Sequence, residues 1–295
     1  VCSASAGSPT AASCDGLDND CDGITDEPVL SGTSTISSAV YNDIEVKPFY
    51  FAGCQGGANS SGTDGLDGGA MLMGTGASGM VFQRLSATGA PVGATSTVFT
   101  YTYTDVDFAQ AGDGYIVAGI WNSSEIDIAY VDSTGVTRVS KEFAWDDSAT
   151  MDSLRVVRAN GRKVTLLWRE DGVGIKIARV EACLSGSTWS FMAPGCASST
   201  LPEITISGTT TAVTGLGADS NVIDWAASQT CTTTTATRQV GVVYRSTTNL
   251  LKFFTINDDG TTKSGETSFT PPTDGLAETD PDVGFFRDAS SDAYL

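Results

Sequence analysis

A repeating order of short apolar segments constrains the fold of this chain more than any other feature of its sequence. Each complete copy has three apolar segments, a turn that contains Gly, and a more polar fourth segment. The segments are rich in Val, Ile, Phe, Tyr and Thr and are bounded by Gly, Asp, Asn and Ser, as β-strands are. The second segments centre on Met71, Ile116, Val164, Val240 and Ala293, which are 45, 48, 76 and 53 residues apart.

Four-strand units at roughly 45–50 residues are typical of a β-propeller, whose sheets stack around a channel. The sequence therefore predicts an all-β fold with a β-propeller over residues 40–295, of which about four to five blades are visible. No window has a sustained helical period, and the 33 glycines argue against long helices. β-Sandwich domains are the alternative. We expect the chain to be a fragment of a longer protein, or else the segment Ser34–Tyr41 to complete the last blade.

Residues 14–29 form an Asp- and Cys-rich loop that follows a Ser/Ala-rich linker, residues 1–13. Counted as a calcium loop, the segment has carboxylates at positions 1, 3, 5 and 9, a Gly at position 6 and a backbone carbonyl at position 7. These residues are Asp18, Asp20, Asp22, Asp26, Gly23 and Ile24. Position 12, where an EF-hand has a bidentate Glu, is Val29, and Glu27 is at position 10. We expect a short Ca²⁺ loop with Glu27 as a further ligand; the alternative is an acidic linker that binds no ion tightly.

The same segment resembles a known repeat. It is similar to the Cys/Asp-rich metal-binding repeat of secreted bacterial proteins, the MopE type, and to the calcium loops of thrombospondin type-three repeats. The matching residues are Cys14, Asp15, Gly16, Asp18, Asn19, Asp20, Cys21, Asp22, Gly23, Asp26 and Glu27. The resemblance covers only residues 14–27 and implies a secreted or surface-exposed bacterial protein with a bound cation.

Charge and the absence of histidine exclude several classes of function. The net charge is −19, so nucleic acid and anionic membrane surfaces are poor partners. With no histidine in the chain, there is no Ser-His-Asp triad and no imidazole zinc site. Any catalysis would therefore use carboxylates, Tyr, Lys or a bound metal.

The seven cysteines indicate disulfides and an oxidising compartment, because none of them forms a Cys-x-x-Cys pair. Cys14 and Cys21 could close one small loop, and Cys183 and Cys196 another. We expect an extracellular or outer cell-surface location.

Acidic pairs recur where the first strand of a unit is expected. They are Asp43 with Glu45, Asp105 with Asp107, and Asp280 with Asp282. Innermost strands border the channel of a propeller, so these acids could lie at the channel mouth. The alternative is that they end loops by accepting backbone N–H groups.

Large aromatic residues lie near the ends of equivalent second strands, at Trp121, Trp168 and Tyr244. They could form a sugar-binding surface or, alternatively, pack between blades.

These features favour a secreted or cell-surface calcium-binding protein without catalytic activity, whose propeller serves adhesion or the binding of protein or carbohydrate. One alternative is a secreted, carboxylate-dependent hydrolase or lyase, which would need two carboxylates roughly 5–10 Å apart. Another is a self-assembling subunit of a surface filament.

Overall fold

The computed structural model describes part of the chain, and every described residue belongs to one unit, residues 39–295. The described residues are 41–50, 66–75, 79–86, 90–146, 148–159, 161–206, 209, 213–220, 239–246, 248, 250–257, 260–270, 281–283, 285–287 and 292–294. The predicted linker and metal loop, residues 1–29, lie outside these ranges.

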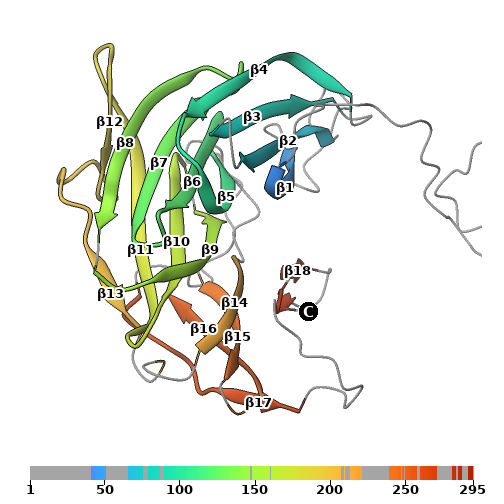
Figure 1. Ribbon diagram of the computed structural model, residues 1–295, viewed down its shortest axis with the longest axis vertical. Helices are drawn as coiled ribbons and strands as arrows, with labels where there is room; N and C mark the ends of the chain where they lie inside the picture. The colour runs from blue at the N-terminus through green and yellow to red at the C-terminus, as the bar shows by residue number, and fades with distance from the viewer. Residues whose placement is uncertain are drawn as a thin grey trace, which may run out of the picture. The chain divides into compact units, whose positions relative to one another are not determined.

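Antiparallel sheets follow one another along the chain, and strands that are adjacent in sequence pair within each sheet (Figure 1). Sheet 1 contains β1 (Tyr41–Tyr50), β2 (Leu66–Thr75), β3 (Met80–Leu85) and β4 (Pro91–Phe99). Sheet 2 contains β5 (Tyr103–Ala111), β6 (Gly114–Trp121), β7 (Glu125–Asp132) and β8 (Thr137–Asp146). Sheet 3 contains β9 (Met151–Arg158), β10 (Lys163–Glu170), β11 (Gly174–Ser185), β12 (Thr188–Met192) and β13 (Glu203–Thr205).

Two further sheets complete the described fold. Sheet 4 contains β14 (Val213–Ser220), β15 (Gln239–Ser246), β16 (Leu251–Asn257) and β17 (Thr267–Phe269). Sheet 5 contains β18 (Phe285–Arg287) and β19 (Asp292–Tyr294). The all-β prediction is confirmed, and no helix in the described ranges has the length and hydropathy needed to cross a bilayer.

Local chemistry explains the turns that the sequence pattern predicts. Between β7 and β8, one carboxylate oxygen of Asp132 accepts the N–H groups of Thr134 at 2.8 Å and Val136 at 3.0 Å. Gly135 in the same turn has a φ of +86°, which glycine adopts readily and residues with a Cβ atom rarely adopt. The Asp-Ser-Thr-Gly tetrapeptide therefore closes this hairpin as expected.

The apolar core lies between sheets, because inner strands such as β6, β7 and β10 bury both faces. Sheets 1 and 2 share a cluster that includes Phe82 and Phe108. Sheets 2 and 3 share the next, with Ile128 and Trp168, and sheets 3 and 4 share a third. The first strands of neighbouring sheets also contact each other: β1 contacts β5, β5 contacts β9, and β9 contacts β14. Sheets 2 and 3 are thus each covered by the sheets that precede and follow them in the sequence.

The first strand of sheet 4 lies in a segment that the apolar pattern does not mark. β14 pairs with β15 along most of its length. The segment was missed because Gly215 and Gly217 weaken its apolar pattern. Gly217 has a packing reason: a Cβ there would collide with the Pro281 carbonyl and lie 2.7 Å from the Cα of Asp282. The chain leading into sheet 5 therefore passes directly against β14.

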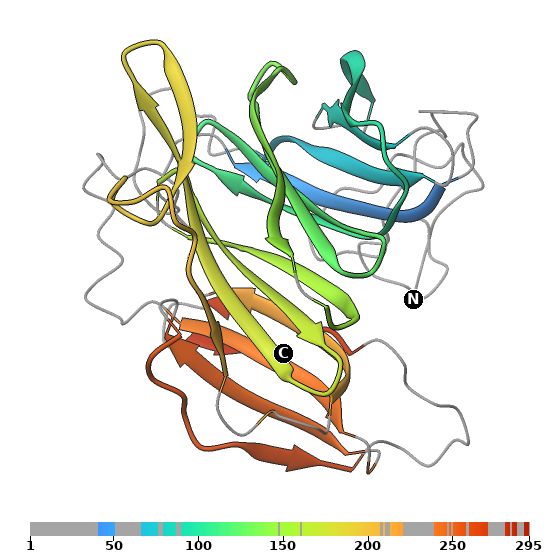
Figure 2. The ribbon, with the colours of Figure 1, turned by 60° about the vertical axis from the view of Figure 1, so that its left-hand side comes forward.

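Sheet 3 contains an inserted segment around Cys183 and Cys196. β11 and β12 form a long hairpin (Figure 2), with β12 pairing the end of β11 from Glu181 to Ser185. β13 pairs the start of β11, from Lys176 to Ala178. The outer edge of this sheet is consequently made of two short strands, with the insertion between them.

Candidate functional site: carboxylates of the first strands

The acids expected at the channel mouth lie on or beside the first strands of their sheets. Asp43 and Glu45 are on β1, and Asp105 and Asp107 are on β5. Asp282 lies just before β18. Asp280 and the side chain of Asp43 are outside what the structure describes.

Asp107 is buried and bound on both carboxylate oxygens. Its side chain accepts the N–H of Val156 on β9 at 2.6 Å and its neighbour Phe108's N–H at 2.7 Å. It also forms an ion pair with Lys47 of β1. With an exposed fraction of 2%, this carboxylate has little access to a ligand in solution.

Asp105 makes the equivalent contact two residues earlier. Its carboxylate accepts the N–H of Leu154 at 2.7 Å. Leu154 and Val156 are alternate residues of β9, an edge strand, so both N–H groups point away from β10. Exposed strand edges carry unpaired N–H groups that need partners. The acidic pair therefore supplies acceptors to the free edge of the next sheet.

Lys47 completes this network and was not singled out by the sequence analysis. Its Nζ donates to the carbonyl oxygen of Val156 at 3.3 Å and lies 5.7 Å from the centre of the Phe108 ring. Lys47 thereby joins the first strands of sheets 1, 2 and 3. A lysine in an otherwise apolar stretch, Val46-Lys47-Pro48, was the available signal.

An arginine, and not an aspartate, makes the hydrogen bond between sheets 3 and 4. Arg169 of β10 forms an ion pair with Asp152 and donates to the carbonyl of Val213 on β14 at 3.0 Å. The hydrogen bond with Asp152 raises the pKa of Arg169, against the effect of burial. Asp282 accepts only the N–H of Val283, at 2.8 Å, among its described hydrogen bonds. The predicted acids thus differ in role from sheet to sheet.

Two of the three aromatic residues at second-strand ends are part of the core. Trp168 and Tyr244 are 0% and 1% exposed, and Trp168 packs against Trp145 with ring centres 5.4 Å apart. Trp121 is different, since it is only partly buried. Packing between sheets therefore accounts for Trp168 and Tyr244 but not fully for Trp121.

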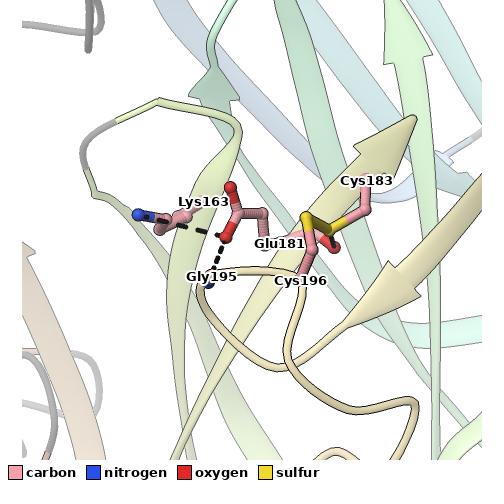
Figure 3. The surroundings of a disulfide bond; sticks show 5 residues. All are labelled: Lys163, Glu181, Cys183, Gly195 and Cys196. Carbon is pink, nitrogen blue, oxygen red and sulfur yellow. Dashed lines mark hydrogen bonds and ion pairs between the residues drawn. A yellow bond between two sulfur atoms is a disulfide. The ribbon is translucent and has the colours of Figure 1, made fainter. Parts of the chain in front are cut away.

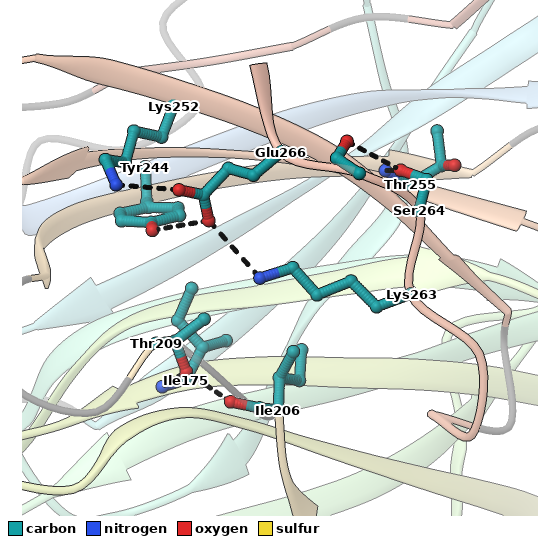
Figure 4. A network of polar contacts seen from close by, with 10 residues as sticks. Ile175, Ile206, Thr209, Tyr244, Lys252, Thr255, Lys263, Ser264 and Glu266 are labelled. Atoms are coloured by element: carbon teal, nitrogen blue, oxygen red, sulfur yellow. Dashed lines mark hydrogen bonds and ion pairs between the residues drawn. The ribbon is translucent and has the colours of Figure 1, made fainter. Parts of the chain in front are cut away.

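Tyr244 belongs to a polar network on sheet 4 that centres on Glu266 (Figure 4). Glu266 accepts hydrogen bonds from the Tyr244 hydroxyl at 2.8 Å, Lys252 at 2.7 Å and Lys263 at 3.2 Å. Partial burial would raise the pKa of Glu266, but these bonds, that from Lys252 foremost, lower it below its ordinary value. Lys263 also lies 4.3 Å from the centre of the Phe254 ring. The network joins the outer part of sheet 4 to its core.

Cys183 and Cys196 form a disulfide across the β11–β12 insertion (Figure 3). Beside it, Glu181 accepts the N–H of Gly195 at 2.6 Å and lies 3.9 Å from Lys163. The two sulfurs and the Glu181 carboxylate are close enough to hold a metal ion, but both sulfurs are part of the disulfide. The disulfide and the Glu181–Gly195 hydrogen bond therefore hold the loop after β12 against β11. Cys14, Cys21 and the expected calcium ligands Asp18, Asp20, Asp22, Ile24, Asp26 and Glu27 lie outside the described residues.

Known proteins resemble this chain in structure but not in sequence. No family model matches the chain, and no curated protein matches it. The solved WD40 domain of SCAP from fission yeast is similar, with a TM-score of 0.42 and 8% sequence identity. The match covers 72% of this chain and 42% of the SCAP chain, so the chain spans less than half of that protein's length.

Proposed function

We propose that this chain is a secreted or cell-surface bacterial calcium-binding protein without catalytic activity, whose sheets are blades of a β-propeller that binds protein or carbohydrate. The observation that carries the non-catalytic part is the state of Asp105 and Asp107. Both bind backbone N–H groups of β9, and Asp107 is also paired with Lys47. A general acid and base must be able to reach the substrate, and these carboxylates are committed to holding sheets together.

The propeller part is supported by the order of the cores. Each apolar cluster lies between sheets that are neighbours in sequence, and their first strands lie in contact. A β-sandwich would instead share one core between two sheets. The calcium and secretion parts rest on the sequence of residues 14–27 and on its resemblance to the MopE-type repeat.

Calcium titration by calorimetry tests the proposal. We expect saturable Ca²⁺ binding by the chain, and its loss in the double variant Asp20→Asn/Asp22→Asn, because two of the expected oxygen ligands lose their charge. Asp171→Asn is the matched control, since Asp171 has a side chain that is 70% exposed and lies far from the loop in sequence. Absence of binding in the unaltered chain, or equal binding in the double variant, would overturn the calcium assignment.

A further inference from the structure

Three aromatic side chains of sheet 2 and its entry form a partly exposed strip. We call Tyr101, Trp121 and Phe143 the aromatic strip; they come from the loop before β5, the end of β6 and the middle of β8. The Trp121 ring centre lies 5.0 Å from that of Tyr101 and 5.9 Å from that of Phe143. Tyr101 and Trp121 pack against the core between sheets 1 and 2, whereas Phe143 is 45% exposed. The strip thus has one side on the core and one in solvent.

Phe143 has a backbone conformation that a bulky residue rarely adopts. Its φ is +52°, and it lies where the β7–β8 pairing contains a bulge. The Phe143 N–H donates to Asp127 at 2.8 Å, and the other oxygen of Asp127 accepts the Tyr103 hydroxyl at 2.6 Å. Asp127 is fully buried, at 0% exposure. The buried Asp127 carboxylate therefore holds Phe143 in a strained backbone conformation, and in this conformation the Phe143 ring is partly exposed to solvent.

Strain of this kind persists only where surrounding structure enforces it, and it concentrates at binding sites. Core packing gives no reason for it here, because Phe143 is 45% exposed. The positive φ of Phe143 thus suggests that its exposed ring takes part in binding.

Polar groups lie beside the strip. Glu125 is the register partner of both Trp121 and Asp146. One Glu125 oxygen is buried and accepts no hydrogen bond from the described residues. Burial, then Asp146 and Asp127, raise the pKa of Glu125. Asn122 is exposed in the adjoining turn, which is held when Met151 donates its N–H to the Ser123 carbonyl at 2.6 Å.

We propose that the aromatic strip, with Glu125 and Asn122 at its margin, is a binding site for a neutral carbohydrate chain. Aromatic rings can cover the C–H faces of sugar rings, while a carboxylate accepts hydrogen bonds from sugar hydroxyls. The net charge of −19 disfavours acidic glycans. This site gives the ligand class for the proposed binding function and rests on that proposal.

Affinity electrophoresis in gels that contain neutral soluble polysaccharides tests the site, with a β-glucan, a xylan, a galactomannan and amylopectin as probes. We expect at least one probe to retard the full chain, and Phe143→Gly to weaken that binding about tenfold or more. Glycine accepts a positive φ, so this variant loses the ring without added backbone strain. Trp121→Ala is the second variant. Phe269→Ala is the matched control, because Phe269 is 51% exposed and lies on sheet 4.

The outcomes separate the site from the broader function. Lost retardation in Phe143→Gly and Trp121→Ala, with folded circular dichroism spectra and unchanged Phe269→Ala binding, supports the assignment. Retardation that survives in both strip variants overturns the strip while leaving a ligand-binding function in place. If no polysaccharide retards the chain, or if a lysine-rich peptide binds through the strip instead, the carbohydrate assignment is wrong. Calcium binding is measured independently of all three results.

Discussion

Replacing Asp107 with alanine is expected to destabilise the unit of residues 39–295 more than any other single change to its first strands. The change leaves the N–H of Val156 without its acceptor and removes the partner of Lys47. Breaking a buried charged pair costs about 3–5 kcal/mol. The side chain of Lys47 is 32% exposed and can regain water, so the lower end, about 3 kcal/mol, applies. For a domain of this size, that corresponds to a fall in Tm of about 6–12 °C.

Thermal unfolding followed by circular dichroism measures this loss. Asp107→Asn, which keeps an acceptor for Val156 but loses the charge, should lose roughly half as much, about 1–2 kcal/mol. Asp171→Ala is the control, since the highly exposed Asp171 should change stability by less than about 0.5 kcal/mol. An Asp107→Ala protein that melts within about 2 °C of the unaltered chain would refute the view that the acid holds neighbouring sheets together.

Two further perturbations have expected results. Replacing both Cys183 and Cys196 with serine should destabilise sheet 3 by up to about 3 kcal/mol, because the disulfide closes a loop with a sequence separation of 13. Limited proteolysis of this variant should then cut between β12 and β13. An unchanged digestion pattern would contradict this expectation. Glu266 should make stability depend on pH: since its pKa is lowered on folding, its contribution is complete above the ordinary carboxyl pKa and is lost as pH falls through the lower folded value. The loss should be absent in Glu266→Gln, and equal acid sensitivity of the two proteins in denaturant titrations would argue against it.

The strands of sheets 2 and 3 could be predicted because their local signals agree. Apolar segments of strand length alternate there with turns such as Asp132–Gly135, and local chemistry then matches the fold. β14 could not be predicted in the same way. Gly217 is required by the approach of Pro281, a residue more than 60 positions away, and that requirement is invisible in the local pattern.

Positions of the acids were predictable, but their partners were not. A sequence places Asp105 and Asp107 at the start of a unit, yet cannot say whether they face a channel or the edge of another strand. Burial decides this, and burial depends on how closely the next sheet packs. Likewise, Trp121 and Trp168 look equivalent in sequence, and only their surroundings distinguish a partly exposed ring from a core residue.

Three side-chain hydrogen bonds between sheets 2 and 3 share one spacing. Asp105 with Leu154, Asp107 with Val156, and Asp113 with Arg162 are each 49 residues apart. Ile116 and Val164 occupy equivalent positions 48 residues apart, so each of these acids meets a residue at or next to its own position in sheet 3.

The same spacing shows what replaces the acidic pair in sheet 3. The positions of Asp105 and Asp107 are taken in sheet 3 by Leu154 and Val156, whose side chains fill the core between sheets 2 and 3. Those residues present N–H groups to the preceding sheet but have no carboxylate for the following one. The next junction therefore needs another device, and Arg169 provides it by reaching the Val213 carbonyl. The first strands of sheets 2 and 3 therefore differ because one has carboxylates and the other has apolar core side chains at the same two positions.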